Sequence, residues 1–376
     1  MSDSTSDGRQ DAGLSADVSR RALLTKMSAL SMLALGGAGL AACTPAPQAA
    51  APASSGQAPA AGGQSAAGQP TAAQAAAAGA PNAGGRPLKA AFSNAGLGAT
   101  WCAQGKEAAE QWGKWFNVEI TWFDGGLSVD KQRKAIEDMA ASKWDFVAIQ
   151  PFGIGTLVDP VKRMIDAGIP VIQMDTVIAP PEANLPVLTF LEPDNVYMGE
   201  VSTEAMIQAI DGKGEIIMTQ GAAGHTGAQG RAKGFNNIVA KYPDIKVVAQ
   251  DFADWDVNKV AKLWEDYLVK YPNVKGAFFH NDDMALAAAK VAKNAGKDIK
   301  MSGVDAMPPA VEAVANGQLV ASVRNPSSRI HWGAVVIGWL AANGEKNIPS
   351  YILMDGPVVT QKNAAGLLYE QKHYLI

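Results

Sequence analysis

Short apolar runs that alternate with amphipathic segments constrain the fold of this chain more than any other feature. The runs are almost continuously apolar, as expected for strands buried on both faces of a parallel sheet. Between them lie segments such as 130–141, where Ile136 and Met139 share one side and charged residues occupy the other. This alternation predicts βαβ units with right-handed crossovers. We expect strands at 88–92, 118–123, 145–150, 169–175, 214–220, 245–251, 274–281, 299–305 and 319–325.

So many strands predict two sheets rather than one. Pro193 interrupts the alternation within 190–195, so we expect the chain to pass there from one Rossmann-like lobe to a second. The fold class is therefore α/β, with two parallel sheets joined by a multi-strand hinge and a further crossing near 351–359. Lobe one is expected over 88–192 plus about 325–350, including a helix at 329–342, and lobe two over 194–323 plus about 351–376.

The first 86 residues are not expected to belong to the fold. Arg20 and Arg21 precede an apolar stretch, 27–40, that is too short to span a bilayer and predicts an export signal over 1–42. The alternative to a lipoprotein signal is an ordinary secretory signal followed by a chance cysteine, Cys43. Residues 44–85 contain no charge and little to bury, so 43–86 is predicted to be a disordered linker.

Charge and cysteine content exclude several classes of protein. A formal net charge of −4 gives no basic face for nucleic acid. Cys43 and Cys102 are the only cysteines, so a lipid on Cys43 would leave no intramolecular disulfide. Cys102 is expected to be a small buried side chain rather than a nucleophile.

Polar side chains follow nearly every predicted strand. Each one alone could be a helix cap or a turn former, but ligands of open α/β sheets bind beyond the carboxyl ends of the strands. Amides and carboxylates there suit the hydroxyls of a sugar or polyol, and indole faces suit its C–H surfaces. The polar residues are Ser93, Asn94, Asp124, Gln150, Asp175, Gln220, Asp251, Asn281, Asp282, Asp305 and Asn325. The nearby aromatic residues are Phe92, Trp101, Phe152, Trp255 and Trp332.

Several segments between 88 and about 345 resemble, in order and spacing, the ribose-type periplasmic sugar-binding proteins of ABC importers. They include "DAGIPVIQMDT", "GRAKGF", "ADWD", "NDDMALAA" and "GVDAMP". The resemblance implies the type I periplasmic binding protein fold, with a ligand held between two lobes. The resemblance implies eight ligand-binding residues: Asn94, Trp101, Asp175, Arg231, Trp255, Asn281, Asp305 and Asn325. We add Gln150 because it ends a predicted strand.

The amino-terminal segment also resembles known export motifs. Residues 19–26, "SRRALLTK", are similar to a Tat signal, and "LAAC" at 40–43 is similar to a lipoprotein signal-peptidase site. This implies cleavage before Cys43 and attachment of lipid to its sulfur.

The chain departs from the ribose-type pattern in two places. Thr176 stands where the family has Arg after the fourth-strand Asp, and "QPFGIG" at 150–155 replaces an Asn-Pro turn, so ribose itself is not the expected ligand. Arg324 and Arg329 could compensate or could be exposed hinge residues, and we favour the second interpretation. The role of His225 is left open.

An enzyme is the first alternative, but neither a Gly-x-Ser-x-Gly elbow nor a His-Glu-x-x-His motif is present. "GAAGHTGAQG" lacks the ending of a P-loop, and Asp282, Asp283 and Asp305 are better explained as caps and sugar ligands than as metal ligands. A transcription regulator of the same fold would not carry an export signal.

We therefore expect a monomeric solute-binding lipoprotein without a cofactor, held by Cys43 on the outer face of the cell membrane or in the periplasm. It would deliver a monosaccharide or polyol to an ABC permease and its ATPase by hinge closure. The sequence does not separate import from sensing by a membrane chemoreceptor or sensor kinase, and a secreted sugar-modifying enzyme is the remote alternative.

Overall fold

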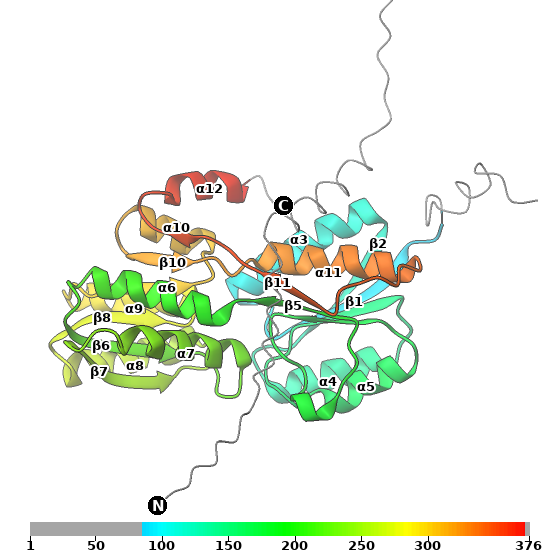
Figure 1. The fold of residues 1–376 in the computed structure, drawn as a ribbon, viewed down its shortest axis with the longest axis horizontal. Coiled ribbons are helices and arrows are strands. Elements are labelled where there is room, and N and C mark those ends of the chain that lie inside the picture. Colours follow the sequence, from blue (N-terminus) through cyan, green and yellow to red (C-terminus); the bar gives the residue numbers. More distant parts are fainter. Residues whose placement is uncertain (1–84, 373–376) are drawn as a thin grey trace, which may run out of the picture. The chain divides into compact units, whose positions relative to one another are not determined.

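The computed structural model describes residues 85–372, which form two six-stranded sheets with helices on both faces of each (Figure 1). The predicted signal over 1–42, Cys43 and the linker up to residue 84 lie outside the described residues. Arg86, predicted to be part of the linker, is already held by the fold, because its guanidinium pairs with Asp145 at 2.6 Å. Among the described residues, no helix is both long and apolar enough to cross a bilayer.

The first sheet is entirely parallel, with strand order β11-β5-β4-β3-β1-β2. Apolar side chains on its two faces pack against α3 and α11 on one side and α4 and α5 on the other. We call this sheet and these helices lobe one. Its strands are β1 (Leu88–Asn94), β2 (Val118–Asp124), β3 (Phe146–Ile149), β4 (Val171–Met174), β5 (Thr189–Pro193) and β11 (Tyr351–Met354). Its helices are α3 (Thr100–Phe116), α4 (Val129–Ala140), α5 (Val158–Asp166), the short η1 (Pro181–Ala183) and α11 (Ser327–Ala342).

The second sheet has the order β12-β10-β9-β8-β6-β7 and is parallel except for β12, which runs antiparallel to β10. One face packs against α6 and α7, and the other against α8, α9 and α10. This sheet and its helices form lobe two. Its strands are β6 (Gly214–Gln220), β7 (Ile245–Phe252), β8 (Val274–Phe279), β9 (Lys300–Val304), β10 (Ala321–Val323) and β12 (Val358–Val359). Its helices are α6 (Asn195–Gln208), α7 (Thr226–Val239), α8 (Val257–Lys270), α9 (Asp282–Asn294), α10 (Pro308–Ala315) and α12 (Ala364–Lys372).

The predicted fold class, two α/β lobes with mostly parallel sheets, is confirmed. The chain passes between the sheets after β5, after β10 and between β11 and β12. One boundary differs from the prediction, which assigned everything from about 351 to lobe two. Tyr351–Met354 pairs in parallel with β5 and so extends the sheet of lobe one, and the chain returns to lobe two only over 355–357.

Three strands were not predicted. β5 was interpreted only as a crossing point, although Thr189 and Leu191 face the interior in strict alternation with half-buried neighbours. β11 and β12 are short, and Tyr351 and Leu353 on β11 are about half exposed. Such short or partly exposed strands lack the continuous apolar run by which the buried strands were identified.

Candidate functional site

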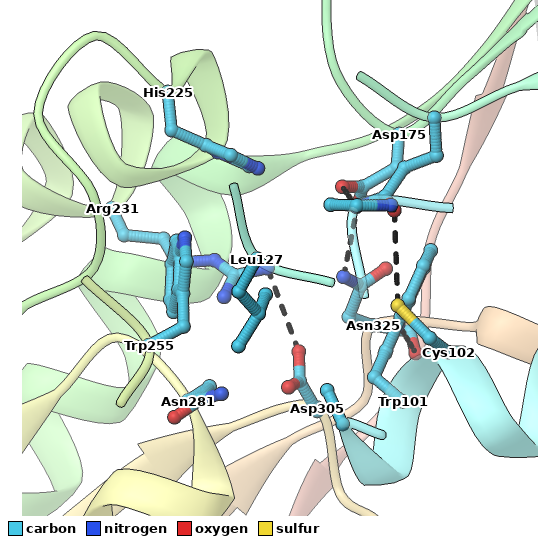
Figure 2. Close-up of a pocket in the computed structure, with 13 residues that line it drawn as sticks. Trp101, Cys102, Leu127, Asp175, His225, Arg231, Trp255, Asn281, Asp305 and Asn325 are labelled. Atoms are coloured by element: carbon cyan, nitrogen blue, oxygen red, sulfur yellow. Dashed lines mark hydrogen bonds and ion pairs between the residues drawn. The ribbon is translucent and has the colours of Figure 1, made fainter. Parts of the chain in front are cut away.

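A pocket lies between the carboxyl ends of the two sheets (Figure 2). Its volume, counted as the space open to the centres of water molecules, is about 50 Å³, against the roughly 10–15 Å³ that one water needs. Eight of the nine predicted ligand-binding residues line it: Trp101, Gln150, Asp175, Arg231, Trp255, Asn281, Asp305 and Asn325. The other lining residues are Ala95, Ala99, Cys102, Leu127 and His225.

The parallel topology brings these residues together. Side chains that lie one or two positions after parallel strands meet at one edge of a sheet, and six of the lining residues are of this kind, including Ala95 and Asn281. Gln150 and Asp175 follow β3 and β4 of lobe one, and Asp305 and Asn325 follow β9 and β10 of lobe two. Helices and loops supply most of the rest, among them Trp101 in α3, Arg231 in α7 and Trp255 after β7.

Asp175 is the most highly coordinated carboxylate of the pocket. Its Oδ2 accepts hydrogen bonds from Gln150 Nε2 at 3.2 Å and Thr176 Oγ1 at 2.9 Å, and its Oδ1 accepts one from Asn325 Nδ2 at 3.1 Å. These donors come from the ends of β3, β4 and β10, so the carboxylate is fixed by both lobes. Asn325 Oδ1 is buried and accepts no hydrogen bond from any described residue, which leaves an open acceptor at the pocket.

Arg231 carries the positive charge of the pocket. Its Nε donates to Asn195 Oδ1 at 3.0 Å, its Nη1 donates to the carbonyl of His280, and its Nη2 lies 3.5 Å from Asp305 Oδ1. The guanidinium also lies 5.8 Å from the ring centre of Trp255. Burial raises the pKa of the Asp305 carboxyl well above its usual value, although the Arg231 charge opposes this shift.

His225, whose role the sequence left open, lines the pocket and touches lobe one. Its Nε2 lies 3.1 Å from Thr176 Oγ1, and the hydroxyl proton of Thr176 is directed at Asp175. The hydroxyl oxygen must then accept from Nε2–H, which leaves Nδ1 without a proton and, among the described residues, without a partner. Burial lowers the pKa of His225 to about 4, so the imidazole is neutral near pH 7.

The loops after β3 and β4 meet the start of α7 and the residues just before it through two more hydrogen bonds beside His225. The backbone N–H of Val177 donates to Thr226 Oγ1 at 3.2 Å, and the N–H of Ile154 lies 3.5 Å from the carbonyl oxygen of Gly224. Lobe one and lobe two are therefore in direct contact along this side of the pocket.

Four lining residues have left-handed backbone conformations that non-glycine residues seldom adopt. The φ angles are 53° at Leu127, 59° at Asp175, 62° at Trp255 and 114° at Asp305. Such strain costs about 1–3 kcal/mol per residue and is concentrated at functional sites. Trp255 further depends on Gly221, because a Cβ at position 221 would lie 2.0 Å from the indole ring.

Asn94 is the one predicted ligand-binding residue that does not line the pocket. It is buried behind the lining, where Nδ2 donates to the carbonyl of Cys102 at 3.4 Å and Oδ1 lies 3.1 Å from His331 Nε2. Arg324 and Arg329 line a separate small cavity at the crossing after β10. Of the nearby aromatic residues, Phe92, Phe152 and Trp332 do not line the pocket either, and Trp332 stacks on Trp112 at 4.4 Å.

Sequence reasoning missed the apolar part of the lining. Ala95, Ala99 and Leu127 have no functional group that would have identified them, and only the Gly-Gly pair before Leu127 signals an unusual loop. Cys102 is free and buried, as predicted, and burial raises the pKa of its thiol so that it stays protonated.

The polar residues at the start of α9 have structural partners. Asn281 Oδ1 caps α9 by accepting from the N–H of Met284 at 3.0 Å. Asp282 accepts from the N–H of Met307 at 2.9 Å and from Ser322 Oγ at 2.6 Å, and burial raises its pKa to about 8. Within residues 85–372, no cluster of three or more His, Cys, Asp or Glu side chains is arranged to bind a metal ion.

Comparison with known proteins identifies a matching family and several similar chains. The periplasmic binding protein domain family matches residues 90–346. A xylitol-binding protein of Mycolicibacterium smegmatis is 27% identical over 269 residues, which cover 70% of this chain and 75% of the relative. A D-allose-binding periplasmic protein of Escherichia coli is 29% identical over 269 residues, covering 68% of this chain and 86% of the relative.

A solved structure agrees with these sequence relationships. The binding protein of the arabinose ABC transporter from Shewanella sp. ANA-3, bound to α- and β-L-arabinofuranose, has a TM-score of 0.70 and 27% identity to this chain. The match covers 76% of this chain and 96% of the solved one. All three similar proteins are named for binding a solute.

Proposed function

We propose that this chain, which belongs to the periplasmic binding protein family, captures an uncharged monosaccharide or polyol outside the cytoplasm and delivers it to an ABC permease. The observation that carries the proposal is the pocket itself. Hydrogen-bonding side chains from the strand ends of two lobes converge there between two indoles, Trp101 and Trp255. A polyhydroxylated molecule matches such a lining, because its hydroxyls both donate and accept and its C–H faces pack on aromatic rings.

The charges of the pocket favour a neutral ligand. Each nitrogen of the Arg231 guanidinium already has a partner in Asn195, the carbonyl of His280 or Asp305. Asp175 adds a second carboxylate, and the low pKa of His225 removes the other source of positive charge near pH 7. An anionic sugar would therefore meet carboxylates without a free cation, so sugar acids and sugar phosphates are expected to be rejected.

The open groups of the pocket are suited to hydroxyls. Asn325 Oδ1 is a buried acceptor that would receive a hydroxyl proton, and Asn281 uses Oδ1 for its helix cap, which leaves its Nδ2 to donate. The named ligands of the relatives, xylitol and D-allose, are both uncharged polyhydroxy compounds. They support the proposed class of ligand.

Delivery would follow from closure of the lobes. Three chain crossings join the lobes, and the ligand would contact both, so its binding stabilises the closed arrangement. The permease would then recognise the paired surfaces of the closed lobes.

A thermal-shift screen tests the proposed ligand class. The panel contains neutral monosaccharides, pentitols, hexitols, inositols and the corresponding sugar acids. At one hundred times its dissociation constant, a true ligand adds about 2.7 kcal/mol to the apparent stability. We expect at least one neutral compound to raise the melting temperature and the matching acid to have no effect. A panel in which only acids stabilise, or nothing does, would contradict the proposal.

We also propose that the chain is exported and anchored through a lipid on Cys43. The support is in the sequence alone: paired arginines, a short apolar stretch and "LAAC" at 40–43. In the source cells, the parent protein should be found in the membrane fraction, and a Cys43→Ser variant should lose its lipid mass and be released. A parent protein without lipid would contradict this part of the proposal.

A further inference from the structure

Asp283, in the first turn of α9, connects lobe two to lobe one outside the pocket lining. Its Oδ1 accepts a hydrogen bond from Thr100 Oγ1 at 2.8 Å, and its Oδ2 accepts one from the backbone N–H of Thr100 at 3.1 Å. The two residues are 183 positions apart in the chain. One carboxylate thus binds both donors of a single residue on the opposite lobe.

The carboxylate of Asp283 is not the hydrogen-bonding cap of its own helix. Asn281 already caps α9 through the N–H of Met284. By contrast, α3 has no cap of its own, because its N-cap residue is Ala99, which has no side-chain acceptor. Free N–H groups at a helix start favour a nearby carboxylate, both as a hydrogen-bond acceptor and as a negative charge. Lobe two therefore supplies the cap of a lobe-one helix.

The capped residue lies directly beside the pocket. Thr100 stands between Ala99 and Trp101, which both line it. The contact is on the α3 side of the pocket, whereas the contacts of His225, Thr226 and Gly224 are made by the loops after β3 and β4. Separating the lobes would break the bonds of Asp283 and leave the start of α3 uncapped.

We propose that Asp283 sets the affinity for ligand as a positioning residue, by capping α3 across the lobes and so stabilising the closed state. The inference rests on the proposed function for its link to affinity, but the contact itself can be tested without any ligand. The bonds are charge-assisted, so their loss is expected to lower the ratio of closed to open molecules on the order of tenfold. The dissociation constant for ligand should rise by a similar factor.

Distances between spin labels report the closed fraction directly. Labels are placed at Lys134→Cys on α4 and Val269→Cys on α8, where both native side chains are more than three-quarters exposed. The full chain carries Cys43→Ser so that only the new thiols react, since Cys102 is buried. Distance distributions are recorded without any sugar and with xylitol, and the dissociation constant for xylitol is measured by calorimetry.

The comparison uses Asp283→Ala, Thr100→Val, their double variant and a control. We expect Asp283→Ala to shift the distribution toward the open distance, and the double variant to shift it no further. Thr100→Val should give a smaller shift, because the backbone N–H remains. Glu312→Gln, which removes an exposed carboxylate of lobe two without known cross-lobe contacts, should match the parent.

The outcomes separate this inference from the proposed function. A shift without sugar supports the role of Asp283 even if xylitol does not bind. Equal closed fractions in the parent and Asp283→Ala, with and without xylitol, would overturn it, as would a parent without any closed population. If xylitol then binds equally well to the parent and to Asp283→Ala, the proposed function is supported and the role of Asp283 is not.

Discussion

The four residues after β8 divide several structural tasks among themselves. His280 Nδ1 accepts from the N–H of Gly221 at 3.2 Å, and Asn281 caps its own helix. Asp282 binds groups within lobe two, while Asp283 reaches lobe one. Capping of α9, the simplest interpretation of "HNDD", therefore applies to Asn281 alone, whereas Asp283 caps α3 of the other lobe. Side chains of one short segment can look alike in sequence and still have partners on different elements.

The ion pair of Arg231 and Asp305 leads to the first prediction. Removing either side chain leaves the other buried without its charged partner, so Arg231→Ala and Asp305→Ala should each weaken ligand binding by about 2 kcal/mol. Calorimetric titration with the compound that stabilises the parent measures this loss, and circular dichroism verifies the fold. Lys246→Ala, which breaks an exposed pair with Glu215, is the matched control. Parent-like affinity in both pocket variants would refute the assigned site.

The second prediction concerns the pH dependence of stability at His225. Its pKa is about 4 in the folded protein and near 6.5 in the unfolded chain. As pH falls below 6.5, the unfolded chain binds a proton first, so the stability that His225 contributes is present above 6.5 and is lost toward pH 4. Between pH 7 and pH 5 this loss is about 2 kcal/mol.

Urea unfolding at these two pH values tests this prediction. A His225→Gln variant should lose about 2 kcal/mol less than the parent between pH 7 and pH 5, because glutamine does not titrate. Equal losses would mean that His225 is protonated as readily in the folded protein as in the unfolded chain.

At the scale of elements, the contact between α6 and α7 determines where Arg231 lies. Gly199 on α6 faces the backbone of Arg231, and a Cβ at position 199 would lie 2.3 Å from the carbonyl oxygen of that residue. Gly234 on α7 makes the reciprocal approach to α6, with Val196 O at 2.2 Å from its ideal Cβ. Small residues thus let the helices pack closely enough to bring the guanidinium to the pocket.

Gly199→Ala is the third prediction. The added methyl group must push α7 away, at a cost of about 1–3 kcal/mol in stability, and the displaced Arg231 should bind ligand more weakly. Chemical unfolding and ligand titration measure the two effects. Gly366→Ala in α12 is the control, because a Cβ there meets nothing within 4 Å and should stabilise the helix slightly. A Gly199→Ala variant as stable as the parent would show that the helices are not closely packed at this point.

The sequence predicted the buried strands well because continuous apolar runs reflect burial on both faces. It failed at β5, β11 and β12, whose pairing depends on neighbours far along the chain rather than on local composition. Polar residues at strand ends were identified as site residues because they carry functional groups, whereas Leu127, which lines the pocket, carries none. Asn94, the last residue of β1, was expected at the pocket but lies behind its lining, because position at a strand end does not reveal which way a side chain faces.

At the scale of the whole molecule, the resemblance predicted from motifs is confirmed by the family match over residues 90–346. Motif order identified the fold, and topology then implied that strand ends of two sheets face one pocket. The sequence did not predict which residues of the two lobes are in contact. The pair of Asp283 and Thr100, for example, joins residues 183 positions apart that no local pattern connects.

Small-angle X-ray scattering during titration tests the central claim that a neutral polyhydroxy ligand holds two lobes closed. The titrant is the neutral compound that most raises the melting temperature, and the matching sugar acid is the control. We predict that the radius of gyration falls as the neutral compound saturates the protein and is unchanged by the acid. A radius of gyration that stays constant or increases while calorimetry records binding would contradict closure as the basis of capture.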